Sequence, residues 1–491
     1  MKSINYALLF FGCILFHVAG TWSIPLIDRD EPRFAEASRE MIERSEYIVP
    51  HFNNQLRLDK PPLAYWAQVA SYRIFGESDF AARFPSAVAA ALVAMSILAW
   101  GSRIGGNHVG WWAAIIFTLS LQTFVHAKAA VADMWLVLFM TTAHWSAYEL
   151  VRDRLWPTDQ ASTLKHQTLF WWFVLYLSLA LGFLAKGPIA WTPLLTLAAM
   201  KLLVGDVQLA KRCKFVRGIL LMLAIVALWG VPALIQTDGE FFRIGIGRHV
   251  VGRSFGAMEG HGANSLGIYL LLLPFYFATI FASFFPWSIK LPALAKKLWR
   301  SRDRTYPEHS RRIDIYLITG AAIIFVIFSL IKTKLPHYTL PAFPLLSLLL
   351  ARHLIDHRQF LNRCAIVTAS IYLVVALFVV PPATRAFPAA QLFRQTRDQL
   401  RPEMEFGAVD FQEPSLVWYF RSRVHGWMTP LNQQSAAEFM QKNGGRFVIL
   451  PTISVAKIFP NLPATWKHFP MQGFNLAKGR DVDLTLVLKP E

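Results

Sequence analysis

The sequence predicts an α-helical membrane protein that crosses the bilayer many times and carries a small α/β domain at its C-terminal end. Hydrophobic residues make up 54% of the 491 residues and charged residues only 16%, whereas soluble domains carry about 25% charged residues. Apolar stretches of about 20 residues recur, the length that a helix needs to cross the hydrocarbon core. The net charge of +18 is spread between these stretches and forms no basic domain, so nucleic acid is not an expected partner.

About eleven stretches are long and apolar enough to be spans, and about 11 to 13 transmembrane helices are expected in all. They cover residues 4–24, 82–102, 110–127, 131–151, 169–186, 188–204, 216–236, 266–289, 313–331, 338–354 and 364–381. The first stretch also has features of a cleaved signal peptide. Because its apolar run is long and continues through residues 21–23, an uncleaved anchor helix fits it better.

Lysine and arginine gather in every second connection between the predicted spans, which assigns those connections to the cytoplasmic side. Prominent among these basic residues are Arg103, Arg152, Arg154, Lys165, Lys211, Arg212, Lys296, Lys297, Arg311 and Arg352. The outward side then receives residues 25–81, 237–265 and 382–491. We therefore expect a transmembrane domain over residues 1–381, with 25–81 as its first outer loop, and an outer domain over residues 382–491.

The C-terminal segment has the pattern of a small α/β domain. The runs "RFVILP" (446–451) and "VDLTLVLK" (482–489) have the composition of strands. The stretch "SAAEFMQKNGG" (435–445) predicts a helix that ends at its glycines. No internal repeat is evident in the sequence, which argues against a transporter built from duplicated halves.

The first predicted outer loop opens with the charged stretch "IDRDEPRFAEASREM" (27–41). A proline and acidic residues near Asp30 suit a helix N-terminus, and the apolar residues that follow suit a helix lying in the membrane interface. The charges over residues 39–44 fit a solvated amphipathic connector. Asp30, Glu31 and Arg33 fit it poorly, because apolar residues would cost less where the span meets water. These three are candidates for function.

Four further charged residues lie near the same predicted depth. Lys60 precedes two prolines that can begin a helix, which makes it either a phosphate ligand or a lysine that reaches toward water. Asp133, Lys186 and Lys334 lie at the outer ends of spans. Charged groups there tend to face an interior cavity and to be functional. The alternative for Asp133 is a structural ion pair with Lys128 or Lys186.

The outer loop over residues 237–265 is rich in glycine and adds basic Arg253. A divalent metal is possible at Asp59, His249 and His261, with Glu259 as a further candidate ligand, although nothing in their spacing requires it. A plain flexible loop is the alternative. The sequence requires no cofactor.

Carboxylates and cations thus collect on one side of the membrane. A carboxylate such as Asp30 or Asp133 can orient or deprotonate an acceptor. Lysine and arginine can bind a phosphate and stabilise it as a leaving group. This combination suits transfer of a group from a lipid-borne phosphate donor. Two alternatives are a ligase or polymerase of lipid-linked glycans and a flippase or transporter of an anionic lipid.

Several motifs resemble, in matching order, those of the aminoarabinose transferase ArnT and its relatives, in the protein-mannosyltransferase-like branch of the GT-C glycosyltransferases. They are "DEPRFAEASREM" (30–41), "IVPHFNNQLRLDKPPLAYW" (48–66), "AKAAVADMWLVLF" (127–139), "FLAKGP" (183–188), "HVVGR" (249–253) and "KTKLPHYTLPAFPLLSLLL" (332–350). The resemblance covers residues 20–355, and the C-terminal domain resembles the family only in kind.

The resemblance implies an enzyme of the bacterial inner membrane that faces the periplasm. It would move a sugar from a polyprenyl-phosphate donor to lipid A or another glycolipid, with protein or polysaccharide acceptors as alternatives. The matching acidic positions are Asp30 with Glu31, and Asp133.

The resemblance also implies which residues meet the donor. Lys60 matches the lysine that grips the lipid phosphate, and Arg253 is a second ligand. Arg33 matches the basic residue after the acidic motif, and Tyr338 the tyrosine of a "KLPxY" stretch. Asp59 departs from the glutamate that the family often has before the lysine.

Overall fold

A computed structural model of the chain describes residues 3–155, 164–204, 213–252, 265–300, 308–382 and 387–490. It divides into two compact units that interleave along the sequence. The first, here called the helical unit, comprises Met1–Val18, Leu58–Ala64 and Pro85–Leu373. The second, here called the mixed unit, comprises Ala19–Arg57, Tyr65–Phe84 and Val374–Glu491. The predicted boundary at residue 381 divides the chain once, whereas these units exchange segments several times.

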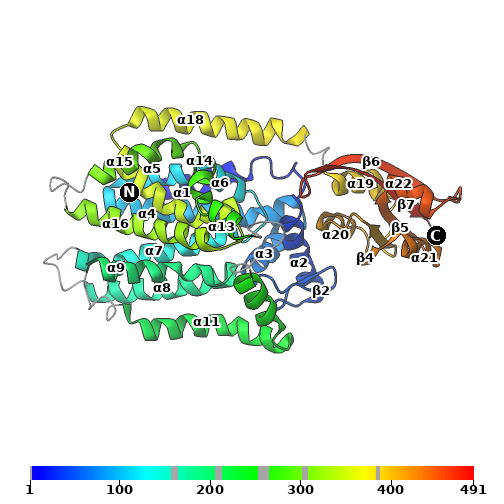
Figure 1. Ribbon diagram of the computed structural model, residues 1–491, viewed down its shortest axis with the longest axis horizontal. Coiled ribbons are helices and arrows are strands. Elements are labelled where there is room, and N and C mark those ends of the chain that lie inside the picture. The colour runs from blue at the N-terminus through cyan, green and yellow to red at the C-terminus, as the bar shows by residue number, and fades with distance from the viewer. Residues whose placement is uncertain are drawn as a thin grey trace. The chain divides into compact units, whose positions relative to one another are not determined.

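The helical unit is built almost wholly from helices (Figure 1). They are α1 (Ser3–Val18), α4 (Asp79–Gly105, whose start lies in the mixed unit), α5 (Asn107–Thr118), α6 (Leu121–His126), α7 (Asp133–Leu155), α8 (Leu164–Lys186), η1 (Pro188–Trp191), α9 (Thr192–Val204), α11 (Phe215–Gln236), η2 (Phe242–Gly252), α13 (Leu266–Leu271), α14 (Phe275–Ser283), η3 (Trp287–Lys290), α15 (Leu291–Arg300), α16 (Glu308–Leu330), η4 (Pro336–Ala342), α17 (Phe343–Leu354) and α18 (Arg358–Val374).

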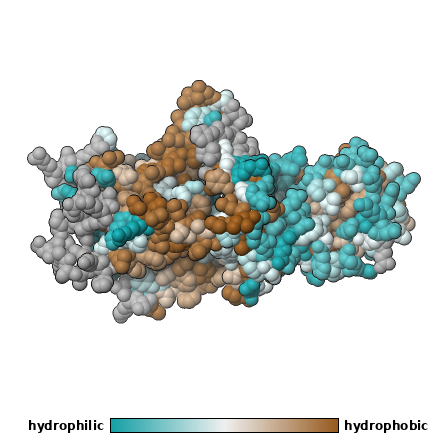
Figure 2. Space-filling model, turned by 90° about the horizontal axis from the view of Figure 1, so that it is seen from below, coloured by the Kyte–Doolittle hydropathy of each residue, from teal (hydrophilic) through white to brown (hydrophobic). Residues whose placement is uncertain are grey.

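Every predicted span contains at least one helix, and several spans are broken into shorter pieces. Within the described ranges, five helices are long and apolar enough to cross a membrane: α4, α8, α11, α16 and α18 with its π-helical continuation η5 (Val375–Val379). The apolar helices α1 and η1–α9 are shorter. Hydrophobic residues dominate the face of this unit seen in Figure 2. On α11, Val216, Leu220, Leu228 and Ile235 are exposed, as suits contact with lipid.

Close packing in the helical unit depends on small residues and on polar clasps. A Cβ atom on Gly101 of α4 would lie 2.6 Å from the Cα atom of Gly110 on α5, so the two helices approach closely only with glycine there. A polar cluster joins further helices of this unit. Asp314 of α16 accepts from Arg352 Nε of α17 at 3.0 Å and pairs with His353 Nε2 at 2.9 Å. Arg352 also donates to the carbonyl of Ile104 at 2.7 Å. These bonds join α4, α16 and α17.

The mixed unit contains a five-stranded sheet of order β4-β3-β5-β7-β6. Its strands are β3 (Glu405–Val409), β4 (Met428–Leu431), β5 (Arg446–Pro451), β6 (Lys467–Asn475) and β7 (Arg480–Lys489). Strand β3 pairs in parallel with β4 and β5, and β7 pairs antiparallel with β5 and β6. The predicted strands match β5 and β7, and the predicted helix matches α21 (Gln433–Gln441). Phe406 and Phe447 stack across the sheet at 5.2 Å.

Further helices complete the mixed unit. They are α2 (Asp30–Arg44), α3 (Leu63–Phe75, which begins in the helical unit), α19 (Pro388–Thr396), η7 (Arg397–Gln399), α20 (Pro414–Phe420) and α22 (Thr452–Ile458), with a hairpin of β1 (His51–Phe52) and β2 (Gln55–Leu56). The short helix α20 contacts α2. Part of the predicted first outer loop therefore belongs to the same compact unit as the C-terminal sheet.

Candidate functional site

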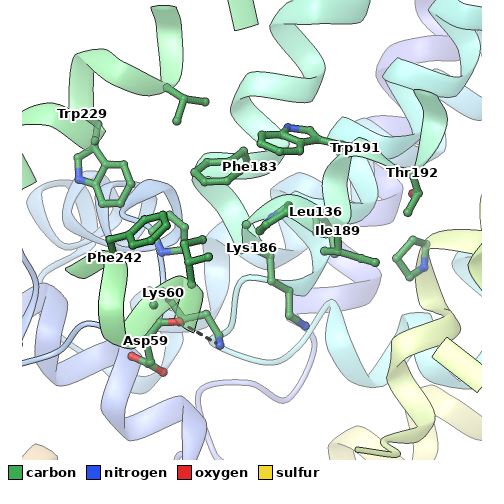
Figure 3. Close-up of a pocket in the computed structure, with 18 of the residues that line it drawn as sticks. Asp59, Lys60, Leu136, Phe183, Lys186, Ile189, Trp191, Thr192, Trp229 and Phe242 are labelled. Carbon is green, nitrogen blue, oxygen red and sulfur yellow. Dashed lines mark hydrogen bonds between the residues drawn. The ribbon is translucent and has the colours of Figure 1, made fainter. Parts of the chain in front are cut away.

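A cavity of about 1040 Å³ lies within the helical unit (Figure 3). Its wall is mostly apolar and includes Leu136, Phe183, Trp191, Trp229, Phe242 and Phe328. Five acidic and basic residues, here called the cavity cluster, also line it: Asp59, Lys60, Asp133, Lys186 and His337. In Figure 3 the ammonium groups of Lys60 and Lys186 lie away from Trp191 and Trp229. The cavity therefore has an apolar part and a charged part.

Helix ends place the charged residues of the cavity cluster. Asp133 begins α7 and Lys186 ends α8, so each charge complements the dipole of its own helix. Gly187 follows with φ of 83°, which lets the chain turn into η1. Lys186 Nζ donates to Asp133 Oδ1 at 2.6 Å and lies 5.8 Å from the centre of the Tyr338 ring. The ion pair that the sequence offered as an alternative for Asp133 is therefore present, with Lys186 as the partner.

Lys60 and Tyr338 also line the cavity, as the sequence prediction needs. Lys60 Nζ donates to the carbonyl oxygen of Asp59 at 3.3 Å. Tyr338 packs against Phe328 with ring centres 4.8 Å apart. Lys60, Lys186 and Tyr338 thus come together in one cavity from three separate parts of the sequence.

Lys334 has a different environment from these residues. Its Nζ donates to the carbonyl oxygens of Phe328 and Ser329 at the end of α16, at 2.9 and 2.5 Å. Burial lowers the pKa of Lys334 to about 8. It is absent from the described lining of the cavity. This geometry supports a helix-capping role for Lys334 rather than the predicted contact with a phosphate.

A group of potential metal ligands lies beside the cavity, but it is not the predicted one. One potential ligand atom from each of His126, Asp133 and His337 lies within 4.8 Å of the others. Burial lowers the pKa of His337 to about 3, which keeps its ring neutral near pH 7. The predicted group of Asp59, His249 and His261 stays a prediction, because His261 and the side chain of His249 lie outside the described residues.

Some predicted residues fall outside the described part of the chain. Arg253, Glu259 and His261 lie outside the described residues, and so does the side chain of His249, whose backbone is in η2. Their predicted roles stay predictions.

In the mixed unit, the neighbours Asp30 and Glu31 have opposite environments. Asp30 is the exposed first residue of α2. Glu31 is buried and accepts from Arg83 twice, Nε to Oε1 at 2.9 Å and Nη2 to Oε2 at 2.7 Å. It also accepts from the backbone N–H of Ile27 at 2.7 Å. Arg33, on the same turn, is half-buried. The geometry supports a structural role for Glu31, while Asp30 stays open to solvent.

Arg83 and helix α20 fix the segment that leads into α2. Arg83 donates to the carbonyl of Pro25 at 2.9 Å as well as to Glu31. The hydroxyl of Tyr419 accepts from the N–H of Leu26 at 2.9 Å and donates to Asp79 Oδ2 at 2.9 Å. Two side chains from distant parts of the sequence, Arg83 and Tyr419, therefore hold the backbone just before Asp30.

Asp28 and Asp79 complete this attachment to α20. Asp28 accepts from the N–H of Ser415 at 2.8 Å and from its hydroxyl at 2.5 Å. Asp79 Oδ1 accepts from the indole of Trp418 at 2.7 Å. Burial raises the pKa of Asp28 to about 7, although the bonds from Ser415 lower it. The sequence analysis did not identify the residues that make this attachment. The one available signal was the charge of Arg83 at the outer end of a predicted span.

Much of the polar face of α2 is buried, while Glu43 and Arg44 near its end are exposed. Arg39 Nη1 donates to Glu36 at 2.8 Å, and its guanidinium lies 4.0 Å from the ring centre of Trp418. Arg421 pairs with Glu36 and, at 2.8 Å, with Glu43. We call Glu31, Glu36, Arg39, Asp79, Arg83 and Arg421 the loop network.

The prediction of a solvated connector over residues 39–44 is therefore wrong for Arg39 and Glu40, which are 3% and 0% exposed. Glu40 accepts from the backbone N–H groups of Asn53 and Asn54. The amphipathic pattern does not reveal that other parts of the chain cover the polar face.

Comparison with known proteins agrees with this architecture. The model of the dolichyl-phosphate-mannose-protein mannosyltransferase family matches residues 59–230. The undecaprenyl phosphate-α-4-amino-4-deoxy-L-arabinose arabinosyl transferase of Edwardsiella ictaluri is 29% identical over 347 residues, which cover 69% of this chain and 57% of that protein. Its counterpart from Yersinia pestis is 27% identical over 357 residues, 72% of this chain and 60% of the relative. The matches thus span less than two thirds of these relatives.

The crystal structure of ArnT from Cupriavidus metallidurans bound to undecaprenyl phosphate superposes with a TM-score of 0.77 at 18% identity, and covers 99% of this chain and 98% of that one. The chain has an ArnT-like fold. The apo form of the same protein gives 0.75, and the oligosaccharyltransferase AglB from Archaeoglobus fulgidus gives 0.51 over 91% of this chain. The predicted resemblance and the predicted fold class of the ArnT-like chain, a multi-pass helical membrane protein with a small C-terminal sheet domain, are confirmed.

Proposed function

We propose that the chain is a glycosyltransferase that moves a sugar from a polyprenyl-phosphate donor to an acceptor at the periplasmic face of a bacterial inner membrane. The observation that carries the proposal is the cavity of about 1040 Å³, with its apolar wall and its two lysines, Lys60 and Lys186. The names of the relatives, which are arabinosyl transferases that use an undecaprenyl phosphate sugar, support the same chemistry.

The cavity has properties that suit the proposed donor. A polyprenyl chain is apolar and matches the wall of aromatic and aliphatic side chains. The phosphate is anionic and matches the ammonium groups of Lys60 and Lys186, which bind it by charge-assisted hydrogen bonds. Cavities of about 300–1000 Å³ enclose drug-sized ligands, so this one has room for the phosphate and the first isoprene units.

The reaction is a displacement at the anomeric carbon. An acceptor oxygen forms the new bond to that carbon, while the bond from the carbon to the phosphate oxygen breaks and the polyprenyl phosphate leaves. Attack on the face opposite the phosphate inverts the anomeric configuration. The lysines stabilise the negative charge that grows on the leaving phosphate. Asp133 holds Lys186 by their ion pair of 2.6 Å, so its contribution is to position that ammonium group.

Asp30 is the residue proposed to act on the acceptor, because it is exposed at the start of α2 and matches the family motif. For a hydroxyl acceptor it removes the proton. For a phosphate acceptor, as on lipid A, the attacking oxygen is already anionic, and Asp30 orients it. We favour lipid A or another glycolipid as the acceptor.

Mass spectrometry of outer-membrane lipid tests the proposal. A deletion strain is complemented with the wild type, with Asp30→Asn, or with Asp30→Glu as a charge-retaining control. We expect a sugar-sized mass to disappear on deletion, to return with the wild type, and to stay absent with Asp30→Asn at equal protein level. Full restoration by Asp30→Asn would refute the role of Asp30. If purified protein released no polyprenyl phosphate from a labelled donor, transferase activity itself would be refuted.

A further inference from the structure

Three ligand-bearing residues meet at the ends of three elements of the helical unit. His126 is the last residue of α6, Asp133 is the first of α7, and His337 lies in the first turn of η4. One potential ligand atom of each lies within 4.8 Å of the others, and His337 Nε2 is 3.9 Å from Asp133 Oδ1. The two imidazole rings have their centres 4.9 Å apart.

We propose that His126, Asp133 and His337 bind a divalent transition-metal ion, and that zinc is the best match. Two imidazoles and one carboxylate are a ligand set that zinc accepts, whereas magnesium and calcium prefer oxygen ligands alone. Zinc bonds of about 2.0–2.2 Å put tetrahedral ligand atoms about 3.4 Å apart. The ligand atoms must therefore approach one another by roughly 1 Å, which side-chain rotation at three element ends permits.

The hydrogen bonding of His126 supports this assignment. Gln122 holds the ring through Nδ1, which lies 3.2 Å from the backbone carbonyl oxygen of Gln122 and 2.9 Å from its side-chain amide nitrogen. Metal-binding histidines are usually held in this way through the ring nitrogen that does not meet the metal.

Lys186 competes with a metal ion for Asp133. Its ammonium group donates to Asp133 Oδ1 at 2.6 Å and repels a second cation at short range. A carboxylate has two oxygens and can serve both partners, but the affinity for the metal is reduced. Removal of this charge should therefore tighten metal binding.

Three protein ligands leave one position of a tetrahedral zinc ion open. Asp133 and His337 both line the cavity, so a ligand in the cavity can reach that position. If the chain is the proposed glycosyltransferase, the fourth ligand is a phosphate oxygen of the donor. Only this assignment of the fourth ligand rests on the proposed function. Metal binding itself does not depend on that function and can be measured without donor.

The test is zinc titration of the full chain, purified in detergent without a histidine tag and stripped with a chelator. We expect about one tightly bound zinc per chain by elemental analysis, and Co²⁺ should give the visible absorption of a tetrahedral site. His126→Ala and His337→Ala should each weaken binding by roughly 100-fold. His357→Ala, a substitution of an exposed histidine, is the matched control and should bind as the wild type does.

Lys186→Met should bind zinc more tightly than the wild type by about tenfold or more, a gain that a misfolded variant cannot produce. The proposal is overturned if the wild type binds no stoichiometric zinc, if both histidine variants bind as the wild type does, or if His357→Ala loses binding equally. If the purified wild-type chain binds zinc but transfers no sugar, the proposed function is refuted and the metal site stands.

Discussion

The cavity cluster of the helical unit and the loop network of the mixed unit both combine acidic and basic residues, but they hold charge in different ways. In the loop network, the carboxylates of Glu31 and Glu36 are bonded to the guanidinium groups of Arg83, Arg39 and Arg421. These side chains are at most 6% exposed. In the cavity cluster, Lys60 and Lys186 reach a cavity large enough for a ligand.

The difference shows that charge in an apolar chain is weak evidence of chemistry until its partners are known. A buried ion pair is costly to break because the remaining charge stays buried, so the loop network should govern stability. A cation beside a cavity is available to a ligand, so the cavity cluster should govern binding and turnover. The predictions below test this division.

The largest effect on stability is expected from Arg83→Ala. The substitution leaves the carboxylate of Glu31 buried without the guanidinium that bonds it twice, a loss of about 3–5 kcal/mol. It also frees the carbonyl of Pro25. The measurement is the unfolding temperature of the purified protein in detergent, with the surviving protein level in membranes as a second readout.

Arg73→Ala is the matched control for this prediction, because Arg73 is exposed and donates at the surface to the hydroxyl of Tyr47 at 2.8 Å. Such a pair contributes about 0–1 kcal/mol. Equal unfolding temperatures for Arg83→Ala and Arg73→Ala would contradict the structural role assigned to the loop network.

The second prediction compares two lysines that sequence analysis treated alike. Lys186→Met should lower the turnover of donor by about 100-fold, because it removes a cation proposed to stabilise the leaving phosphate. Lys334→Met should change turnover by less than about threefold and lower the unfolding temperature, since Lys334 bonds two carbonyls at the end of α16. The turnover of both variants is measured by release of labelled polyprenyl phosphate. Reversal of the two outcomes would move the phosphate site to Lys334.

The helices and the terminal strands could be predicted from sequence because local patterns determine them. An apolar run of about 20 residues has one stable form in a bilayer, and runs such as "RFVILP" have the composition of a buried strand. The lysines of the cavity were found for a similar reason, since charge at the end of a span is rare and conspicuous.

The loop network could not be predicted because its partners are far apart in the sequence. Asp79 and Tyr419 are separated by 340 positions, and Asp28 and Ser415 by 387. Asp30 and Glu31 look equivalent in a motif, yet successive helical positions point about 100° apart, and one is exposed while the other is buried. A single sequence contains no signal that distinguishes them.

A smaller effect is expected from Tyr419→Phe. The substitution removes the hydroxyl that accepts from the N–H of Leu26 and donates to Asp79, at a cost of about 1–3 kcal/mol for the groups left without a partner. Hydrogen exchange of the segment around Leu26 should become faster. Tyr47→Phe, which removes an exposed hydroxyl, should leave that exchange unchanged. Unaltered exchange in both variants would show that α20 does not hold this segment.

The smallest effect concerns pH. Burial raises the pKa of Asp28 to about 7 from 3.8, so between these values the folded protein binds more protons than the unfolded chain. Stability should therefore fall as pH rises from about 4 to about 7. Glu40, with its pKa raised to about 7, adds to the same trend. Asp28→Asn keeps the contacts to Ser415 without the charge and should make the decline shallower by a few degrees of unfolding temperature, since about 1 kcal/mol shifts such a protein by roughly 2–4 °C. An identical decline in the variant would mean that Asp28 is already ionised at pH 4, and that its bonds from Ser415 outweigh the cost of its burial.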